Sequence, residues 1–302
     1  MNRKWLFLVI LLLVIVWVVN TSRPGRQVEG CLDGCASESP VEQENLKVIS
    51  LNMLHGFPCF ELLDERLQII ADGIDVLEPD IVLLQEVPWT LRRGNAAKHI
   101  AEQTGMNYAY LRANGNRWAI GFEEGEAILS RFPLLDPAFS TLKPRSGFFE
   151  NRVVLHARVE TNLGDVGLYV THLTHDNPKV NQGQAETLKA YLQSQEVEFS
   201  VVAGDFNALP TSPQISMLKS KWLDVFDGFA VNETGNTCCI DNLDQSLAKL
   251  TKRIDYVFVI PGEKTPSLVS RSLVFDTPSF YDEGWVWASD HVGLMALLGL
   301  LP

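Results

Sequence analysis

The stretch VAGDFN, residues 202–207, decides most about the fold of this 302-residue chain. An apolar run over 199–203 has the length and composition of a buried strand, and a glycine, a carboxylate and an amide follow it closely. If the chain stays extended there, Asp205 and Asn207 point to the same side. Gly-Asp-x-Asn is equally common as a turn, so this stretch alone leaves a site and a turn both open.

Polar side chains stand at the ends of other predicted strands in the same way. They are Asn52 after 47–51, Glu86 after 81–84, His172 after 166–170, Asp255 before 256–260, and Asp290 with His291 before 292–298. Taken singly, each has an ordinary explanation as a turn residue or a core histidine. Strand ends on one edge of a layered fold converge, however, and a buried carboxylate is costly unless it is paired or bound to a metal. The set therefore indicates one site, whose hard oxygen ligands suit Mg²⁺ or Mn²⁺.

Short apolar runs bounded by turn residues predict the strands of the fold. They cover 47–51, 81–84, 127–130, 153–159, 166–170, 199–203, 256–260 and 292–298. Apolar residues at spacings of three and four predict helices over 63–77, 96–104 and around 185–192. Strands outnumber helices and several follow each other directly, which predicts an α+β layered fold.

The beginning of the chain differs in character from the rest. Arg3 and Lys4 precede an unbroken apolar run over 5–19, which is typical of a signal anchor or a secretory signal peptide. No clean small-residue cleavage pattern follows, so we expect residues 1–20 to be an uncleaved membrane anchor. The basic start then places the following chain on the extracytoplasmic side, periplasmic or extracellular. A cleaved signal and a secreted protein are the alternative.

Composition divides the remainder into a linker and a domain. Residues 21–45 are rich in Gly, Ser, Pro and Glu and predict a flexible linker, while residues 46–302 predict one domain. Cys31 and Cys35 lie in the linker; a disulfide is expected in an oxidising compartment, and inert thiols are the alternative. The formal net charge of −12 repels nucleic-acid phosphates unless a basic patch or a bound cation offsets it.

Seven motifs in order carry a family resemblance. They are LNMLHG (51–56), LLQEV (83–87), GEAILSRFPL (125–134), YVTHL (169–173), VAGDFNALP (202–210), RIDYVFV (253–259) and SDHVGLMALL (289–298). This series resembles the endonuclease/exonuclease/phosphatase superfamily, which includes deoxyribonuclease I-like nucleases, inositol-polyphosphate 5-phosphatases and neutral sphingomyelinases. The resemblance implies a four-layer α/β sandwich of two packed mixed sheets, and a metal-dependent hydrolase of phosphoester bonds with its site at one edge.

The resemblance also implies which residues hold the metal and which meet the substrate. Glu86 resembles the direct metal ligand, Asn52 its partner, and Asp290 a further metal contact. Asp205 resembles the residue that activates water or handles the leaving group, and Asn207 the donor that holds a phosphoryl oxygen.

Two histidines complete the implied catalytic set. His291 resembles the catalytic histidine, and His172 the second histidine that nucleases of the deoxyribonuclease type and sphingomyelinases carry. We expect Asp255 rather than Asp290 to orient His291, because adjacent residues in an extended segment point to opposite sides.

The substrate is the least determined part of this prediction. Trp285 and Trp287 directly precede Asp290 in the sequence, so we expect them to bind substrate beside the site, where Trp favours a membrane interface; a core position is the alternative. A membrane-associated phosphodiesterase acting on a lipid headgroup is therefore preferred. The alternatives are an extracytoplasmic nuclease, endonuclease or exonuclease, and a non-catalytic binding module on the same fold.

Overall fold

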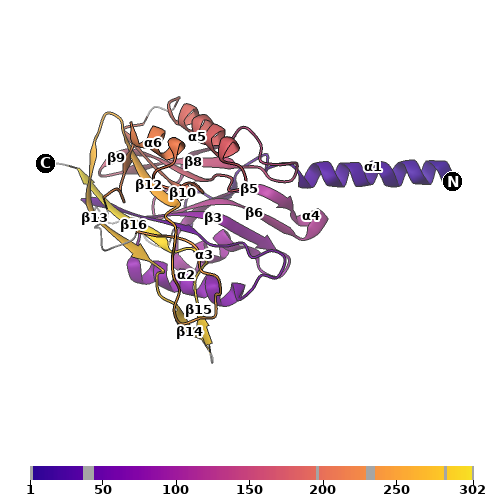
Figure 1. Cartoon of the computed structure of the whole chain (residues 1–302), viewed down its shortest axis with the longest axis horizontal. Helices are drawn as coiled ribbons and strands as arrows, with labels where there is room; N and C mark the ends of the chain where they lie inside the picture. The colour runs from indigo at the N-terminus through magenta and orange to yellow at the C-terminus, as the bar shows by residue number, and fades with distance from the viewer. Residues whose placement is uncertain (1–2, 37–43, 195–196, 229–234, 282–283, 301–302) are drawn as a thin grey trace.

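The computed structural model describes residues 3–36, 44–194, 197–228, 235–281 and 284–300. In this part of the chain two mixed β-sheets pack face to face, and helices cover the outer face of each sheet (Figure 1). The predicted four-layer α/β sandwich is therefore confirmed.

The first sheet follows the order β1-β5-β6-β3-β2-β16-β13, with β4 paired to β3. Its strands are β1 Glu29–Cys31, β2 Asn45–Asn52, β3 Ile81–Thr90, β4 Gly94–Asn95, β5 Asn107–Asn116, β6 Phe122–Ser130, β13 Pro266–Val274 and β16 Gly293–Leu300. At its centre β2 runs parallel to β3 and antiparallel to β16. The ends of β2 and β3 and the start of β16 therefore meet at one edge.

The second sheet follows the order β11-β12-β10-β9-β8-β7. Its strands are β7 Leu135–Thr141, β8 Val153–Thr161, β9 Gly164–His172, β10 Phe199–Asp205, β11 Leu223–Asp224 and β12 Asp255–Pro261. β10 runs parallel to β9 and antiparallel to β12. Helix α5, Pro178–Leu192, forms the crossover that a parallel pair requires.

The helices form where the apolar spacing predicts them. α2, Leu63–Leu77, buries Leu67, Ile70 and Ile74 and ends before Pro79, whose ring excludes a further helical turn. α3, Ala96–Thr104, begins at Asn95, whose side chain accepts a hydrogen bond from the Lys98 amide (3.2 Å). The remaining helices on the domain are α4, Arg117–Ile120, and α6, Pro213–Lys219.

Three apolar layers hold the sandwich together. The largest lies between the sheets and joins residues such as Val48 and Leu83 of the first sheet to Val201 and Val257 of the second. A second layer packs the first sheet against α2 and α3, and a third packs the second sheet against α5 and α6. Burial at each layer determines which face of every strand points inward, and this specifies the register in which neighbouring strands pair.

A single apolar helix, α1, Arg3–Thr21, projects from the sandwich (Figure 1). It has 19 residues with a mean hydropathy of 2.3 and is 6% buried, so its length and composition allow it to cross a membrane. Its last turn touches the domain, where the Trp17 indole donates to the Ala119 carbonyl (3.2 Å).

The segment after α1 differs from the predicted flexible linker in the residues that are described. β1 pairs with β5, opposing Glu29 to Tyr110, and the Gly25 amide donates to the Arg112 carbonyl (2.7 Å). Backbone pairing at the edge of the first sheet therefore holds this segment, although its composition resembles a linker. A disulfide joins Cys31 and Cys35. Residues 37–43 lie outside the described residues.

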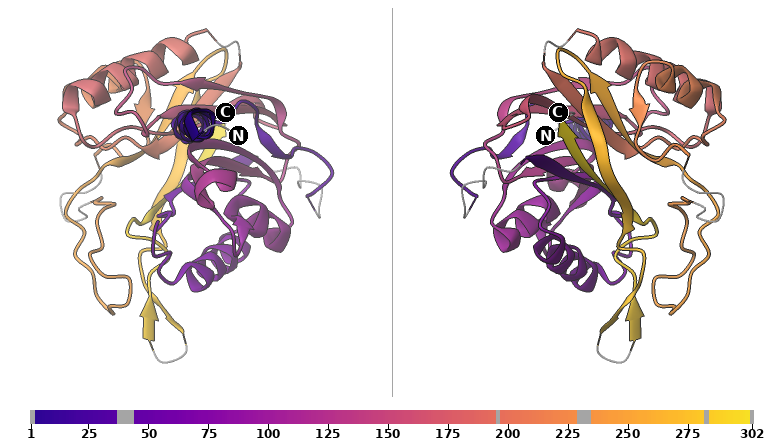
Figure 2. Two further views of the ribbon diagram at one scale, coloured as in Figure 1. Left: turned by 90° about the vertical axis from the view of Figure 1, so that its right-hand side faces the viewer. Right: turned by 90° about the vertical axis from the view of Figure 1, so that its left-hand side faces the viewer.

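A small hairpin forms a separate two-stranded sheet, β14 Ser279–Tyr281 and β15 Gly284–Val286 (Figure 2). It projects from the sandwich beside α2 (Figure 1). Trp285 of this hairpin is 40% exposed and packs edge-on against Phe280, with ring centroids 5.2 Å apart. The hairpin thus presents two aromatic rings to solvent.

Candidate active site

Three neighbouring strands of the second sheet end in one row of polar residues. In the register of this sheet Asp205 lies opposite His172 of β9 on one side and Asp255 of β12 on the other. Gly204, one residue earlier, permits close strand contact: a Cβ there would lie 1.8 Å from the Thr171 carbonyl oxygen. Only glycine allows this approach, so VAGDFN positions the row through its backbone as well as its side chains.

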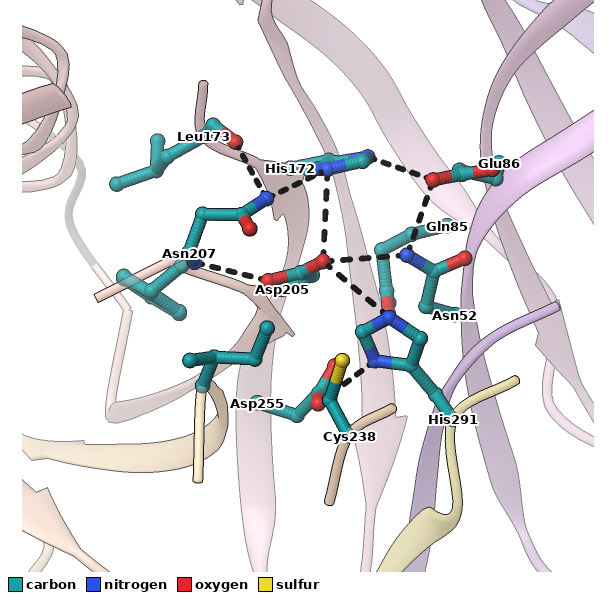
Figure 3. A network of polar contacts seen from close by, with 12 residues as sticks. Asn52, Gln85, Glu86, His172, Leu173, Asp205, Asn207, Cys238, Asp255 and His291 are labelled. Carbon is teal, nitrogen blue, oxygen red and sulfur yellow. Dashed lines mark hydrogen bonds and ion pairs between the residues drawn. The ribbon is translucent and has the colours of Figure 1, made fainter. Parts of the chain in front are cut away.

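The first sheet contributes Asn52 from the end of β2 and Glu86 from the middle of β3. Between Leu84 and Val87 the pairing of β3 with β6 shifts register, and Glu86 adopts a left-handed conformation with φ 53°. A β-bulge of this kind changes the direction in which the side chain at the bulge points. The Asn52 amide then donates to Glu86 Oε1 and to Asp205 Oδ2, both at 3.2 Å, and so connects the two sheets (Figure 3).

His291 stands against a carboxylate at the bottom of this cluster. Its Nδ1 lies 2.9 Å from Asp255 Oδ2, and its Nε2 lies 3.9 Å from Asp205 Oδ2 (Figure 3). Burial disfavours the imidazolium, but the charge and hydrogen bond of Asp255 outweigh it and raise the pKa of His291 well above its ordinary value. The geometry assigns the contact with His291 to Asp255, as expected from the alternation of side chains.

Burial and neighbouring charges separate the two carboxylates that face the cavity. Burial, reinforced by the Asp255 carboxylate, raises the pKa of Asp205 to about 7. Burial also opposes ionisation of Glu86, but the nearby His55, whose ring lies 3.6 Å away and whose amide donates at 3.1 Å, lowers the pKa of Glu86 to about 2. The pKa of Glu86 is therefore lowered where that of Asp205 is raised, and a lowered pKa favours the deprotonated form in which carboxylates bind metals.

His172 and Asn207 form the opposite wall. His172 Nε2 lies 3.5 Å from Asp205 Oδ2 and 3.0 Å from the Asn207 amide nitrogen (Figure 3). Burial, with the Arg152 charge, lowers the pKa of His172 well below its ordinary value. The pKa values of the two histidines are thus shifted in opposite directions, because among the described residues His291 has a hydrogen-bonded carboxylate partner and His172 does not.

Asp290 lies behind Asn52 and is linked to it through a serine. Ser289 Oγ donates to the Asn52 carbonyl at 2.6 Å and approaches Asp290 Oδ1 at 3.2 Å. Burial raises the pKa of Asp290. Asp290 is thus linked to the Asn52 backbone through Ser289, and the charges of both His291 and Glu86 act on it.

A cavity of about 550 Å³ opens over these residues. Besides the predicted Glu86, His172, Asp205, Asn207 and His291, its lining includes His55, Asn114, Glu124, Arg152, His175 and Lys252. The sequence prediction missed this second group. Arg152 directly precedes β8 and Glu124 is the third residue of β6, and a charged residue at the start of a strand is the signal that identifies them. Arg152 supplies a mostly buried cation that pairs with Glu150 at 2.9 Å.

The residues of the site have the chemistry that a divalent cation requires. Asp205, Asp255 and His291 offer ligand atoms within 4.8 Å of one another, and the predicted pair of Glu86 and Asn52 adjoins them. One carboxylate oxygen of Asp255, Oδ1, is buried without a hydrogen-bond partner in the described part of the chain. Several carboxylates converge here, and a bound cation offsets such a concentration of negative charge.

The two tryptophans expected beside the site lie elsewhere. Trp287 is 5% exposed, packs with Ile240 and Val292, and donates from its indole to the Gln245 carbonyl (2.7 Å). It is a core residue. Trp285 belongs to the hairpin beside α2, and neither ring lines the cavity among the residues described. Proximity in sequence to Asp290 was misleading, because the chain turns between Val286 and Ser289.

A two-sheet sandwich with acids, amides and histidines gathered at one edge is the architecture of a phosphoester hydrolase. This chain belongs to the endonuclease/exonuclease/phosphatase family, whose sequence profile matches residues 49–291. Members of this family hydrolyse phosphoester bonds and generally use divalent metals.

Known proteins are similar over most of the chain. Protein angel of Drosophila melanogaster is 27% identical over 292 residues, which cover 84% of this chain and 77% of that protein. A crystal structure of D. rerio TDP2 complexed with a single-strand DNA product aligns with a TM-score of 0.66 and 16% identity, over 85% of this chain and 100% of that one. A mannosyl-6-phosphatase of Bacteroides thetaiotaomicron aligns with a TM-score of 0.65 and 19% identity, over 84% and 99%. The structural likenesses establish the fold.

Proposed function

We propose that this chain is a divalent-metal-dependent phosphodiesterase, tethered to a membrane by residues 5–19 and acting on a lipid headgroup. One observation carries the catalytic part: the buried His291–Asp255 pair faces Asp205 in the same cavity that holds Glu86. A histidine oriented by a carboxylate and an adjacent acid are the groups that hydrolysis by water requires.

The proton steps follow from these positions. Water attacks the phosphorus, the bond to the leaving oxygen breaks, and the proton of the water passes to Asp205. Protonated His291, held by Asp255, transfers its Nε2 proton to the leaving oxygen, so the alcohol product departs neutral. Asn207 and His172 face the phosphoryl oxygens from the opposite wall and orient the ester.

Mg²⁺ or Mn²⁺ is the proposed cofactor, and Glu86 with Asn52 and Asp290 would hold it. A bound cation supplies positive charge to the phosphoryl oxygens and lowers the cost of placing an anionic ester among carboxylates. Glu86 suits this position because it is ionised and because the bulge in β3 directs it into the cavity.

The lipid preference is supported by charge and by the apolar helix. A net charge of −12 disfavours long polyanions, whereas a helix able to cross a bilayer keeps the domain near lipid headgroups. Trp285 and Trp287 give the lipid preference no support, since neither lines the cavity.

A nuclease is the second candidate, and one observation favours it. Phe149 lines the cavity next to Arg152, and an exposed ring beside a cation is the arrangement on which unpaired bases stack. The TDP2 structure with its DNA product shows that this fold accommodates a single strand in that protein.

The decisive experiment compares substrates with the metal controlled. The full chain in detergent micelles is assayed with Mg²⁺ or EDTA on bis(p-nitrophenyl) phosphate, p-nitrophenyl phosphate, sphingomyelin, lysophospholipid and supercoiled DNA. We expect Mg²⁺-dependent cleavage of the diester and of a lipid. DNA cleavage without lipid turnover would select the nuclease, and preference for the monoester would select a phosphatase. Inactivity on every substrate would contradict a hydrolase.

Membrane topology needs its own measurement. We expect a reporter fused after Pro302 to be active outside the cytoplasm, and the protein to remain with membranes in high salt. Release of a chain that lacks residues 1–20 would instead establish a cleaved signal.

A further inference from the structure

The end of α1 is fixed to the domain. Thr21 and Ser22 are buried, and the Ser22 carbonyl accepts hydrogen bonds from Arg145 Nη2 (2.8 Å) and Asn151 Nδ2 (3.3 Å). On its other side Trp17 donates to Ala119 of α4. The helix therefore has a defined place on one face of the sandwich, the face that Figure 2 shows on the left with α1 directed at the viewer.

The residues that hold α1 are direct neighbours of the catalytic cavity. Asn151 donates from its backbone to Asn114 Oδ1 (2.7 Å), and Asn114 in turn hydrogen-bonds Glu124. Asn114, Glu124 and Arg152 all line the cavity. Hence a single relay of hydrogen bonds connects the helix end to the cavity wall.

Large apolar side chains project into solvent on both sides of the helix end. Trp118 is 92% exposed and Ile120 half-exposed on α4, and Leu91, 79% exposed, lies against α4 at Gly121. On the other side Phe148 is 56% exposed, and its carbonyl accepts from the same Arg145 that binds Ser22. We name Leu91, Trp118, Ile120 and Phe148 the rim patch.

Charge on this face suits a lipid surface as well. Arg23 and Arg26, directly after α1, are exposed, although the chain as a whole is acidic. Basic residues next to a membrane-spanning helix are attracted to an anionic lipid surface. Exposed apolar rings interspersed with arginine are typical of an interfacial contact rather than of a free surface.

We propose that the face bearing α1 rests on the bilayer, with the rim patch inserted among the headgroups and the cavity mouth at headgroup level. The occupant is the surface of the membrane that α1 crosses, because α1 leaves the domain between the two halves of the patch. This inference rests on the proposed function in two respects, that α1 crosses a membrane and that the cavity receives phosphoesters from that membrane.

The first test measures which tryptophans lie close to the lipid acyl chains, and it does not depend on enzymatic activity. The full chain is reconstituted in vesicles of phosphatidylcholine and phosphatidylglycerol whose acyl chains are brominated, and quenching of tryptophan fluorescence is compared between variants. Trp118→Phe should lower the quenched fraction, because it removes a quenched ring. Trp285→Phe is the matched control and should not lower it. The reverse result, loss with Trp285→Phe alone, would overturn the proposal and place the β14–β15 hairpin on the membrane.

The second test separates docking from chemistry. In vesicles, Trp118→Asp with Phe148→Asp should lower turnover of lipid substrate about tenfold and leave hydrolysis of soluble bis(p-nitrophenyl) phosphate within twofold. Val76→Asp with Val269→Asp, also exposed apolar residues but on α2 and β13, should change neither rate. Equal lipid turnover in both double variants would contradict the docking. Should no lipid be cleaved at all, the lipid specificity fails while the quenching result still decides the orientation.

Discussion

Two buried histidines of this molecule show how a partner decides the chemistry of a side chain. His291 contacts Asp255 at 2.9 Å, and its pKa is raised although burial opposes the charge. His156 of β8 stacks on Tyr169 at 4.4 Å, and neither of its ring nitrogens has a hydrogen-bond partner in the described residues. Burial lowers the pKa of His156 to about 4. Burial is common to both residues, so the Asp255 carboxylate accounts for the opposite shifts of their pKa values.

Replacing His291 by alanine tests the histidine that has a carboxylate partner, and of all the predictions it has the largest expected effect on turnover. We expect turnover of bis(p-nitrophenyl) phosphate to fall about a thousandfold or more, and Asp205→Ala to do the same, because both groups meet the reacting ester. His156→Phe is the matched control and should retain wild-type turnover. A His291→Ala or Asp205→Ala enzyme with more than about a tenth of the wild-type rate would remove the role assigned to that residue.

Replacing Asp255 tests whether its charge is the cause of the difference between His291 and His156. Asp255→Asn keeps the shape but takes away the charge that holds His291 protonated and oriented, so we expect turnover to fall about a hundredfold. Asp255→Glu, which restores the charge, should recover part of the loss. Steady-state kinetics would contradict this role if the asparagine variant stayed within about threefold of wild type.

Glu86 gives an intermediate effect that concerns the metal. Glu86→Gln removes a charged hard ligand and keeps its shape, so the Mg²⁺ concentration for half-maximal activity should rise about tenfold or more. Glu160→Gln, an exposed change at the end of β8, serves as control. Identical Mg²⁺ titrations for the Glu86 variant and wild type, or full activity in excess EDTA, would exclude this metal position.

His156 gives the smallest effect, on stability rather than activity. A histidine in the unfolded chain has a pKa of about 6.5, so the unfolded state binds the proton first as the pH falls. The stabilisation from neutral His156 is complete above that pH and is lost on approaching a pH of about 4, by up to about 3 kcal/mol. Urea unfolding at both ends of this range should show that His156→Phe flattens the loss. An equally steep loss in the variant would assign it to other groups.

Strand ends were the most informative feature of the sequence. The residues predicted to meet do come together in the structure: Asn52, Glu86, His172, Asp205, Asn207, Asp255 and His291. β2, β9 and β10 end and β12 begins at one edge, whereas Glu86 lies within β3 and is directed to the site by the bulge. The roles of these residues stay predictions. Helix bounds over 63–77 and 96–104 also agree with α2 and α3.

Two strands and the position of one tryptophan are among the features that were not predicted correctly from the sequence, each for a physical reason. β13 escaped prediction because it is an edge strand, paired only with β16, and lacks an apolar run. β1 escaped because its three residues gain regularity only from pairing with β5. The prediction for Trp287 was wrong because the sequence does not distinguish a tryptophan of the core from one that binds substrate. The packing of Trp287 against Ile240 in the structure makes the distinction.

The fixed end of α1 has a consequence for how this protein would meet its substrate. Ser22 is hydrogen-bonded to Arg145 and Asn151, so the described residues include no flexible linker between the end of α1 and the domain. The domain would therefore stay at the surface of a membrane that α1 crosses. Its search for substrate then becomes two-dimensional, and the rate depends on the mole fraction of substrate in the membrane rather than on its concentration in bulk solution. Under the proposed function the cavity would reach only one leaflet of the membrane that α1 crosses, so in a sealed vesicle hydrolysis would stop when that leaflet is exhausted.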